Sequence, residues 1–449
     1  MLLKMRRYWG LGILFLGFVE GNAQDSVFAR TFIETLTATE MYGRNASHQG
    51  EWKAADFVAK TMQENQLKAF GNSYFQSVSY PNKAYSGNVT LSINGVFLEP
   101  LEDFVIAPES KCDSICADAV MLYDSNFLSL KFKKIYKNKF LVVDLTRLDN
   151  TSKTHEKIRT EAIQWALKNK ALGLIFIVDN FRSYRVAEFQ NYKDLIIIEV
   201  KKTAKNPIGH AELVSASPVN KGIAGQARND ERGKICLTGK ATYLPDYQTK
   251  NVIGYLEGRE AKDSFVVITA HYDHLGTMGD NTIFYGANDN ASGVALMLDL
   301  AKTLQKDSLK YTLVFIACCG EEMGLLGSKF FVENPLIDLS KVKMAINFDL
   351  LCAGDKGITV VNGLNHPQKT ELLTKINTEN KYLPEITPEK NAKNSDHYWF
   401  TAQNIPAFFI YAKGKTGKGH HPSDTCENCT LSGYNSIFKL FYQFIKELN

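Results

Sequence analysis

The sequence contains few of the features that mark specialised classes of protein. Eight cysteines in 449 residues are too few for a fold held together mainly by disulfides. A formal net charge of +4, partly from basic residues near the amino terminus, does not favour binding to nucleic acid or to an acidic surface. No repeat of fixed period is present. These absences are typical of an ordinary globular protein.

Long apolar runs are also absent, apart from one near the amino terminus. Lys4, Arg6 and Arg7 precede an apolar run over residues 8–19, and small residues follow at the −3 and −1 positions for cleavage after Ala23. This pattern predicts a signal peptide over residues 1–23. The run is shorter than the roughly 20 residues that cross a bilayer. We therefore expect an exported protein, periplasmic or secreted, with no stable membrane insertion after cleavage.

The length of the chain exceeds what one hydrophobic core normally supports, so we expect two domains. Residues 24–74 are predicted to be helical, with Trp52, Ala55, Val58 and Met62 on one helix face. The later segments divide into a β-rich domain over 75–245, with an inserted loop at about 201–234, and a domain of alternating strands and helices over 246–449. The oligomeric state stays open.

The alternation in the last domain predicts an α/β sheet with helices on both sides. The expected strands are 265–270, 312–318, 342–348, 358–361 and 405–412. One expected helix begins at residue 291, and the others span 325–332, 368–377 and about 437–448. In the β-rich domain the expected strands include 74–78, 89–93, 140–145, 172–178 and 195–200, with a helix near 161–170. Polar residues at the carboxyl ends of such strands form the usual ligand site.

The cysteines suggest only local pairing. Cys112 with Cys116 and Cys426 with Cys429 are the candidates for short disulfides, and a redox or metal role for these pairs is less favoured. Cys318 and Cys319 end an apolar strand and are expected to be buried thiols.

Metal chemistry is first suggested by the H-x-D pattern of His271 and Asp273, which follows the apolar strand 265–270. His271 can offer one ring nitrogen to a metal, while Asp273 on the same face can hold the other ring nitrogen. Asp289 lies in a glycine-flanked turn before a helix and would approach His271 if the loop folds back.

Three other strands end in carboxylates or histidines. Glu321 and Glu322 follow one strand, Asp349 follows the next, and a glycine-rich loop after the last strand ends in His420 and His421. Two histidines and three or four carboxylates without a thiolate suit paired zinc ions with room for water. Consecutive glutamates point in different directions, so one can bind metal while the other acts as a base.

Six motifs in order over residues 265–425, HYDHLG, GANDNASG, GEEMGLLGS, NFDLL, SDH and HHPSD, resemble the M28 family of co-catalytic zinc metallopeptidases, mainly aminopeptidases. The resemblance implies a three-layer zinc-peptidase fold with a mixed, mostly parallel central sheet, plus an inserted domain similar to protease-associated domains and an amino-terminal helical segment packed on the peptidase domain. Two zinc ions per chain and peptide substrates are implied with it.

Carried over residue by residue, the resemblance implies the following roles. His271 and Asp349 hold one zinc ion, Glu322 and His420 hold the other, and Asp289 bridges them. Glu321 is the general base and Asp273 is the partner of His271. His420 matches the ligand because the family pattern is H-x-P-x-D. Asp396, His397 and Tyr398 are expected in the substrate pocket, and the tyrosine that stabilises the tetrahedral intermediate is one of Tyr285, Tyr398 and Tyr411.

Other activities share this fold. A glutaminyl-peptide cyclotransferase with a single zinc carries a segment like Asp349-Leu350-Leu351, but the five-ligand set and GEEMGLLGS disfavour it. Receptor-like relatives typically lose ligands, and none is missing here. Asn288 stands where many members carry an acidic residue, but this position is next to the implied ligand Asp289 and the difference removes no ligand. A carboxypeptidase or dipeptidase of the same family stays open, because specificity lies in pocket loops.

Overall fold

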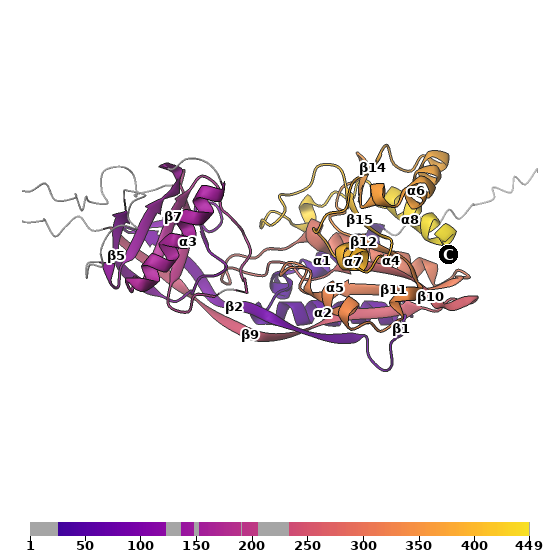
Figure 1. The fold of residues 1–449 in the computed structure, drawn as a ribbon, viewed down its shortest axis with the longest axis horizontal. Helices are drawn as coiled ribbons and strands as arrows, with labels where there is room; N and C mark the ends of the chain where they lie inside the picture. Colours follow the sequence, from indigo (N-terminus) through magenta and orange to yellow (C-terminus); the bar gives the residue numbers. More distant parts are fainter. Residues whose placement is uncertain (1–25, 123–135, 148–151, 190, 205–232, 449) are drawn as a thin grey trace, which may run out of the picture.

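The computed structural model describes residues 26–122, 136–147, 152–189, 191–204 and 233–448. The predicted signal peptide and most of the predicted loop at 201–234 lie outside the described residues. Figure 1 shows two lobes joined by two long strands, β2 (Phe75–Ile93) and β9 (Lys234–Leu256). We call residues 104–201 the small lobe, and residues 26–69 with 257–448 the large lobe. Within the described chain, no helix is both long and apolar enough to cross a membrane.

The large lobe is built on a mixed, mostly parallel sheet, as the sequence predicts. Its strand order is β14-β13-β15-β12-β10-β11-β9. Parallel pairs join β15 to β12, β12 to β10, and β10 to β11, whereas β9 runs antiparallel to β11. The bounds are β10 (Ala261–His271), β11 (Tyr311–Cys318), β12 (Val342–Phe348), β13 (Ile358–Val361), β14 (Ile386–Pro388) and β15 (Ala407–Ala412). The carboxyl ends of the four parallel strands therefore lie at one edge.

Helices cover both faces of this sheet, which gives three layers (Figure 1). Along β10, Val266 and Ile268 pack into one core and Val267 into the other, as the period of two in a strand requires. The first core contains α1 (Ser26–Leu36), α2 (Gly50–Glu64), α4 (Ser292–Leu304), α6 (Pro367–Asn380) and α8 (Tyr434–Leu448). The second contains α5 (Leu326–Glu333) and α7 (His397–Ala402). The apolar stripes predicted for α2 and α8 face the first core, except that Trp52 is 40% exposed.

The small lobe has its own sheet, in which β5, β6, β7 and β8 are parallel and β4 is antiparallel to β8. Figure 1 shows α3 (Ser152–Lys168) lying along this sheet. The strand bounds are β4 (Phe104–Ile106), β5 (Ile115–Leu122), β6 (Phe140–Asp144), β7 (Gly173–Val178) and β8 (Ile196–Lys201). Short strands β1 (Lys68–Ala69) and β3 (Val96–Leu98) pair with β9 and β2.

The two long strands correct one expectation from the sequence. Segments 74–78 and 89–93 were expected as separate strands, but both belong to β2, which pairs with β9 from Phe75↔Val252 to Ile93↔Ile235. The register shifts at two places along this pair, which lets one strand pass the irregular stretch between the two segments. The predicted domain limits at 74/75 and 245/246 fall at the start of β2 and inside β9, and the division into domains stays a prediction.

The disulfides also differ from the expected local pairs. Cys116 bonds to Cys236, and Cys352 bonds to Cys429. Cys116 and Cys236 face each other directly across the antiparallel pair of β5 and β9, so sheet register, not sequence proximity, decides the partner. Cys112 and Cys426 are buried free thiols, as are Cys318 and Cys319, which confirms the expectation for the last two.

The Cys352–Cys429 bond is expected to stabilise the large lobe. It closes a loop over a sequence separation of 77 residues; the chain-entropy model gives about 4.5 kcal/mol for such a loop, and disulfides typically contribute roughly 2–4 kcal/mol. Replacing both residues with alanine should lower the free energy of unfolding by about this amount, measured by urea unfolding under oxidising conditions. Cys426→Ala is the control for losing a buried sulfur without losing a bond. Equal stability of the double variant and the oxidised parent would contradict the prediction.

Candidate metal centre

The predicted metal ligands meet at the carboxyl edge of the large-lobe sheet. His271 ends β10, Glu322 follows β11, Asp349 follows β12, and His420 lies in the loop after β15. Asp289 lies in a short π-helical turn, Ala287–Ala291, immediately before α4. Since the strands that carry the first four are parallel neighbours, their carboxyl ends converge.

Asp289 lies between the two histidines. Its Oδ1 is 3.3 Å from His271 Nε2, and its Oδ2 is 3.0 Å from His420 Nε2. Each histidine has a second carboxylate: Asp349 Oδ1 is 3.3 Å from His271 Nε2, and Glu322 Oε2 is 3.3 Å from His420 Nε2. The arrangement is thus two histidine–carboxylate pairs that share one carboxylate.

Several buried polar atoms of this cluster have no hydrogen-bond partner within the described chain. They include His271 Nε2, Asp349 Oδ1 and His274 Nε2. Donor atoms of His271, Glu321 and Asp349 lie within 4.8 Å of one another, as do those of His274, Asp289 and Glu322. Unpaired buried polar atoms are costly, and a cation satisfies them. Nitrogen and carboxylate oxygen donors without a thiolate fit zinc sites with open positions.

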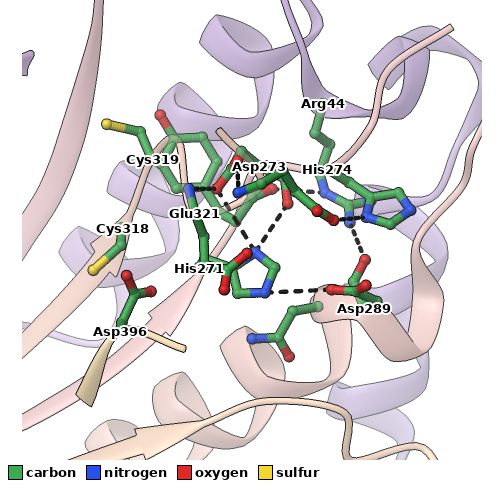
Figure 2. Close-up of polar contacts among 12 residues, drawn as sticks. Arg44, His271, Asp273, His274, Asp289, Cys318, Cys319, Glu321 and Asp396 are labelled. Carbon is green, nitrogen blue, oxygen red and sulfur yellow. Dashed lines mark hydrogen bonds and ion pairs between the residues drawn. The ribbon is translucent and has the colours of Figure 1, made fainter. Parts of the chain in front are cut away.

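Asp273 supports two parts of the centre at once (Figure 2). Its carboxylate accepts the backbone N–H groups of Glu321, at 3.1 Å, and Glu322, at 3.2 Å. The same carboxylate lies 3.6 Å from His271 Nδ1, and the Asp273 carbonyl oxygen lies 3.2 Å from that nitrogen. The predicted contact with His271 is therefore longer than an ordinary hydrogen bond, and Asp273 also fixes the Glu321–Glu322 turn.

A chain of hydroxyl and amide groups holds Asp349. Ser395 donates to Asp349 Oδ2 at 2.8 Å, Asn347 donates to Ser395 Oγ at 2.7 Å, and Thr269 donates to Asn347 at 2.7 Å. All four side chains are buried. This series of hydrogen bonds was not predicted from the sequence, although Ser395 belongs to the SDH motif and Asn347 to the NFDLL motif.

The backbone of the Asp289 loop is held by two charged residues whose roles were not predicted from the sequence. Asp424, from the HHPSD motif, accepts the backbone N–H groups of Asn288 at 2.9 Å and Asp289 at 3.1 Å. Arg44, from the amino-terminal segment, donates to the carbonyls of Tyr285 at 2.6 Å and Gly286 at 2.8 Å. Burial lowers the pKa of Arg44 to about 10, against the raising effect of the Asp289 charge. The guanidinium stays charged at neutral pH.

His274 is a further buried neighbour that was not predicted. Its Nδ1 lies 2.9 Å from Glu322 Oε1, so it approaches the carboxylate from the side away from His420. Figure 2 places it beside Arg44 and Asp289. The residue directly follows Asp273 in the HYDHLG motif, which is the signal that points to it.

Glu321 sits at the pocket side of the cluster. Burial raises its pKa well above the usual range, and the neighbouring charges of Glu322 and Asp349 act in the same direction, while His271 opposes them. A carboxylate with a raised pKa accepts a proton more readily near neutral pH, which suits a general base.

A pocket of about 390 Å³ opens over the centre. Its lining residues are Arg185, Asp289, Glu321, Glu322, Asp349, Leu350, Asn394, Phe409, Tyr411 and His420. Of the three candidate tyrosines, Tyr411 is the one in this lining. Asp396, His397 and Tyr398, expected in the pocket, do not line it, and the first two are fully buried. Asp396 instead accepts a hydrogen bond from Ser328.

Glu51, from α2, is a buried carboxyl group close to Asp273, and its ionisation makes the free energy of unfolding depend on pH. Tyr80 donates to its Oε1 at 2.8 Å, and burial, with the charge of Asp273, raises the Glu51 pKa to about 8. In the unfolded chain this group ionises near pH 4.3. Between these values the folded state binds more protons, so stability falls as pH rises through this window.

Glu51→Gln should remove this pH dependence, because the amide never has to ionise. We expect the variant to exceed the parent in free energy of unfolding by up to about 5 kcal/mol at pH 8, with the difference vanishing near pH 4. Thermal unfolding from pH 4 to pH 9 measures it. Glu64→Gln, at an exposed position of the same helix, is the matched control. A difference that does not vary with pH would contradict the prediction.

Comparison with known proteins places this cluster in a family. Residues 251–445 match the model of peptidase family M28. A probable zinc metalloprotease of Pyrenophora tritici-repentis is 34% identical over 126 residues, which are 27% of this chain and 26% of that protein. Aminopeptidase YwaD of Bacillus subtilis is 35% identical over 118 residues, or 26% of this chain and 24% of that protein. The chain thus aligns with about a quarter of the length of these relatives.

The fold is similar to solved structures over nearly the whole chain. A peptidase M28 precursor from Shewanella amazonensis has a TM-score of 0.64 at 19% identity and covers 95% of this chain and 94% of its own. The motifs that bring His271, Asp289, Glu322, Asp349 and His420 together all lie inside the matched region. The carboxyl-terminal region of this chain, residues 251–445, belongs to peptidase family M28.

Proposed function

We propose that this protein is an exported metallo-aminopeptidase that removes amino-terminal residues from peptides with two zinc ions per chain. The observation that carries the proposal is the position of Asp289, with one oxygen toward each of the two histidines. A carboxylate shared in this way is the arrangement expected of a bridging ligand in a paired-metal site. Family membership and the names of the related proteins support the same conclusion.

In this proposal, His271 and Asp349 would hold one ion, Glu322 and His420 would hold the other, and Asp289 would contribute to both sites. When bound, zinc ions polarise the scissile carbonyl and make water more acidic. The chain supplies the remaining parts. Asp273, Ser395 and Asp424 fix the ligand carboxylates and backbone, so the site is formed before substrate arrives.

Glu321 is the proposed general base. It takes a proton from the attacking water and returns it to the leaving amine, which its raised pKa favours. The carboxylates around the pocket also suit a positively charged α-amine of the substrate, which favours attack at the first peptide bond. Tyr411, in the pocket lining, is the candidate for stabilising the oxyanion of the tetrahedral intermediate.

Export is proposed from the signal peptide predicted over residues 1–23. Two disulfides support it, because such bonds persist in oxidising compartments and are rare in the cytosol. The proposed location is the periplasm or the medium.

A substrate panel tests this function. The full mature protein is assayed with leucinamide, Leu-Ala-Ala, its amino-acetylated form and a peptide with amino-terminal glutamine, before and after treatment with a chelator. We expect cleavage of the substrates with a free amine, no cleavage of the acetylated peptide, and loss of activity on chelation. Cyclisation of the glutamine peptide would identify a cyclotransferase, and cleavage of the acetylated peptide from its carboxyl end would identify a carboxypeptidase.

A further inference from the structure

One residue of the small lobe lines the pocket over the metal centre. Arg185 lies in the segment between β7 and β8, whereas the other lining residues come from the large lobe. Among the described residues that line the pocket, Arg185 is the only arginine or lysine. It faces a lining with four carboxylates, from Asp289, Glu321, Glu322 and Asp349. The pocket therefore has carboxylates in one lobe and a cation in the other.

The segment that carries Arg185 is anchored firmly in the small lobe. Arg182 Nη2 lies 2.8 Å from Glu109 Oε2, and the Arg182 backbone N–H donates to Glu199 at 2.8 Å. Glu109 and Glu199 also pair with the buried Arg159, at 2.8 Å and 2.7 Å. Arg182 is thus held to two buried carboxylates, through one guanidinium nitrogen and through its backbone N–H, and these charge-assisted bonds limit how far the segment can shift.

The same segment packs against the large lobe on both sides of Arg185. The Tyr184 ring meets the His421 ring edge-on, at 6.4 Å between centroids, next to the proposed ligand His420. Ala187 is buried in the main core of the large lobe, and Val186 is buried in the core between the lobes. Glu102, which lies just before the small lobe in sequence, places its Oε1 3.4 Å from His421 Nε2. These contacts fix where Arg185 enters the pocket.

The Arg185 guanidinium is available to a ligand. The residue is exposed, and no carboxylate within the described chain forms an ion pair with it, in contrast to Arg182. A guanidinium binds carboxylates in a bidentate manner, and such charge-assisted bonds are stronger than neutral ones. A substrate with an amine at one end and a carboxylate at the other matches this distribution of charge.

We propose that Arg185 binds a carboxylate on the leaving side of the scissile bond, so that the enzyme prefers dipeptides, or peptides with an acidic second residue, over neutral substrates. This inference rests on the proposed function, because it takes the metal centre as the place of cleavage. The small lobe then acts as one wall of the substrate site and sets its specificity.

Three substrates separate the sources of the carboxylate. Leu-Ala has a terminal carboxylate, Leu-Glu amide has a side-chain carboxylate, and Leu-Ala amide has none. We expect Arg185→Ala to lower kcat/KM for Leu-Ala by roughly 10- to 100-fold, mainly through KM, and to change hydrolysis of Leu-Ala amide by less than about twofold. Arg185→Lys should retain part of the preference. A parallel loss with Leu-Glu amide would extend the site to acidic side chains.

Binding provides a readout that does not need turnover. The affinity of Leu-Ala and of Leu-Ala amide is measured by calorimetry for metal-loaded Glu321→Gln protein, with and without Arg185→Ala. Arg259→Ala, an exposed arginine outside this pocket, is the control. Tighter binding of the acid that disappears with Arg185→Ala supports the site even if the protein hydrolyses nothing. Equal affinity for acid and amide, or equal losses for both in the Arg185 variant, would overturn it.

Discussion

Glu321→Gln is expected to lower kcat by about 100- to 10,000-fold while the protein keeps its full zinc content. Glutamine has nearly the same shape but cannot accept the proton from water. Glu321 lines the pocket, and its backbone is fixed by Asp273, so the substituted side chain should stay in place. The measurements are kcat on leucinamide and zinc per chain by elemental analysis.

Glu322→Gln is the matched comparison, because it changes the neighbouring side chain in the same way. Glu322 contacts both His420 and His274 and is a proposed ligand, so its loss should lower zinc content as well as turnover. If Glu321→Gln lost zinc to the same extent as Glu322→Gln, or kept more than about a tenth of its activity, Glu321 would not be the base.

Asp289→Asn should lower both zinc content and turnover, the latter by at least about 1,000-fold. Within the described chain, Asp289 is the carboxylate that contacts both His271 and His420. Asparagine removes the negative charge and replaces one acceptor oxygen with an N–H donor, which cannot bind a cation. Zinc per chain after dialysis and kcat on leucinamide measure the effect, with circular dichroism to show that the fold is kept.

Asp263→Asn is the control, since Asp263 is 90% exposed and lies near the start of β10, whereas the proposed ligand His271 ends that strand. It should retain zinc and activity. Normal zinc content in Asp289→Asn would contradict a bridging role for this residue, whatever its activity.

Much of the large-lobe fold is predictable from local pattern. Buried strands such as 313–318 are continuous apolar runs, and their carboxyl ends follow from where the polar residues begin. Because parallel strands end at one edge, the residues that follow them converge, and His271, Glu322 and Asp349 were expected together for this reason. Assigning Asp289 and His420 to particular roles needed the family motifs, because both lie in loops.

Features that depend on long-range contacts were not predictable. The pairing of β2 with β9 joins segments more than a hundred residues apart, and so does the pairing of β5 with β9 that carries the Cys116–Cys236 bond. Arg44 supports the Asp289 loop through backbone carbonyls, which carry no sequence signal. The residues that line the pocket also differ from those expected, for the same reason. Asp396 and His397 belong to the SDH motif but are buried outside the lining, whereas Arg185 reaches the pocket from the small lobe.

The most direct test of the account is a zinc titration of the metal-free mature protein, with bound zinc and leucinamide hydrolysis measured on the same samples. We expect saturation at about two zinc ions per chain, with activity rising as the sites fill and absent from the metal-free protein. Saturation at one ion with cyclisation of amino-terminal glutamine would contradict the account, as would full activity without bound metal.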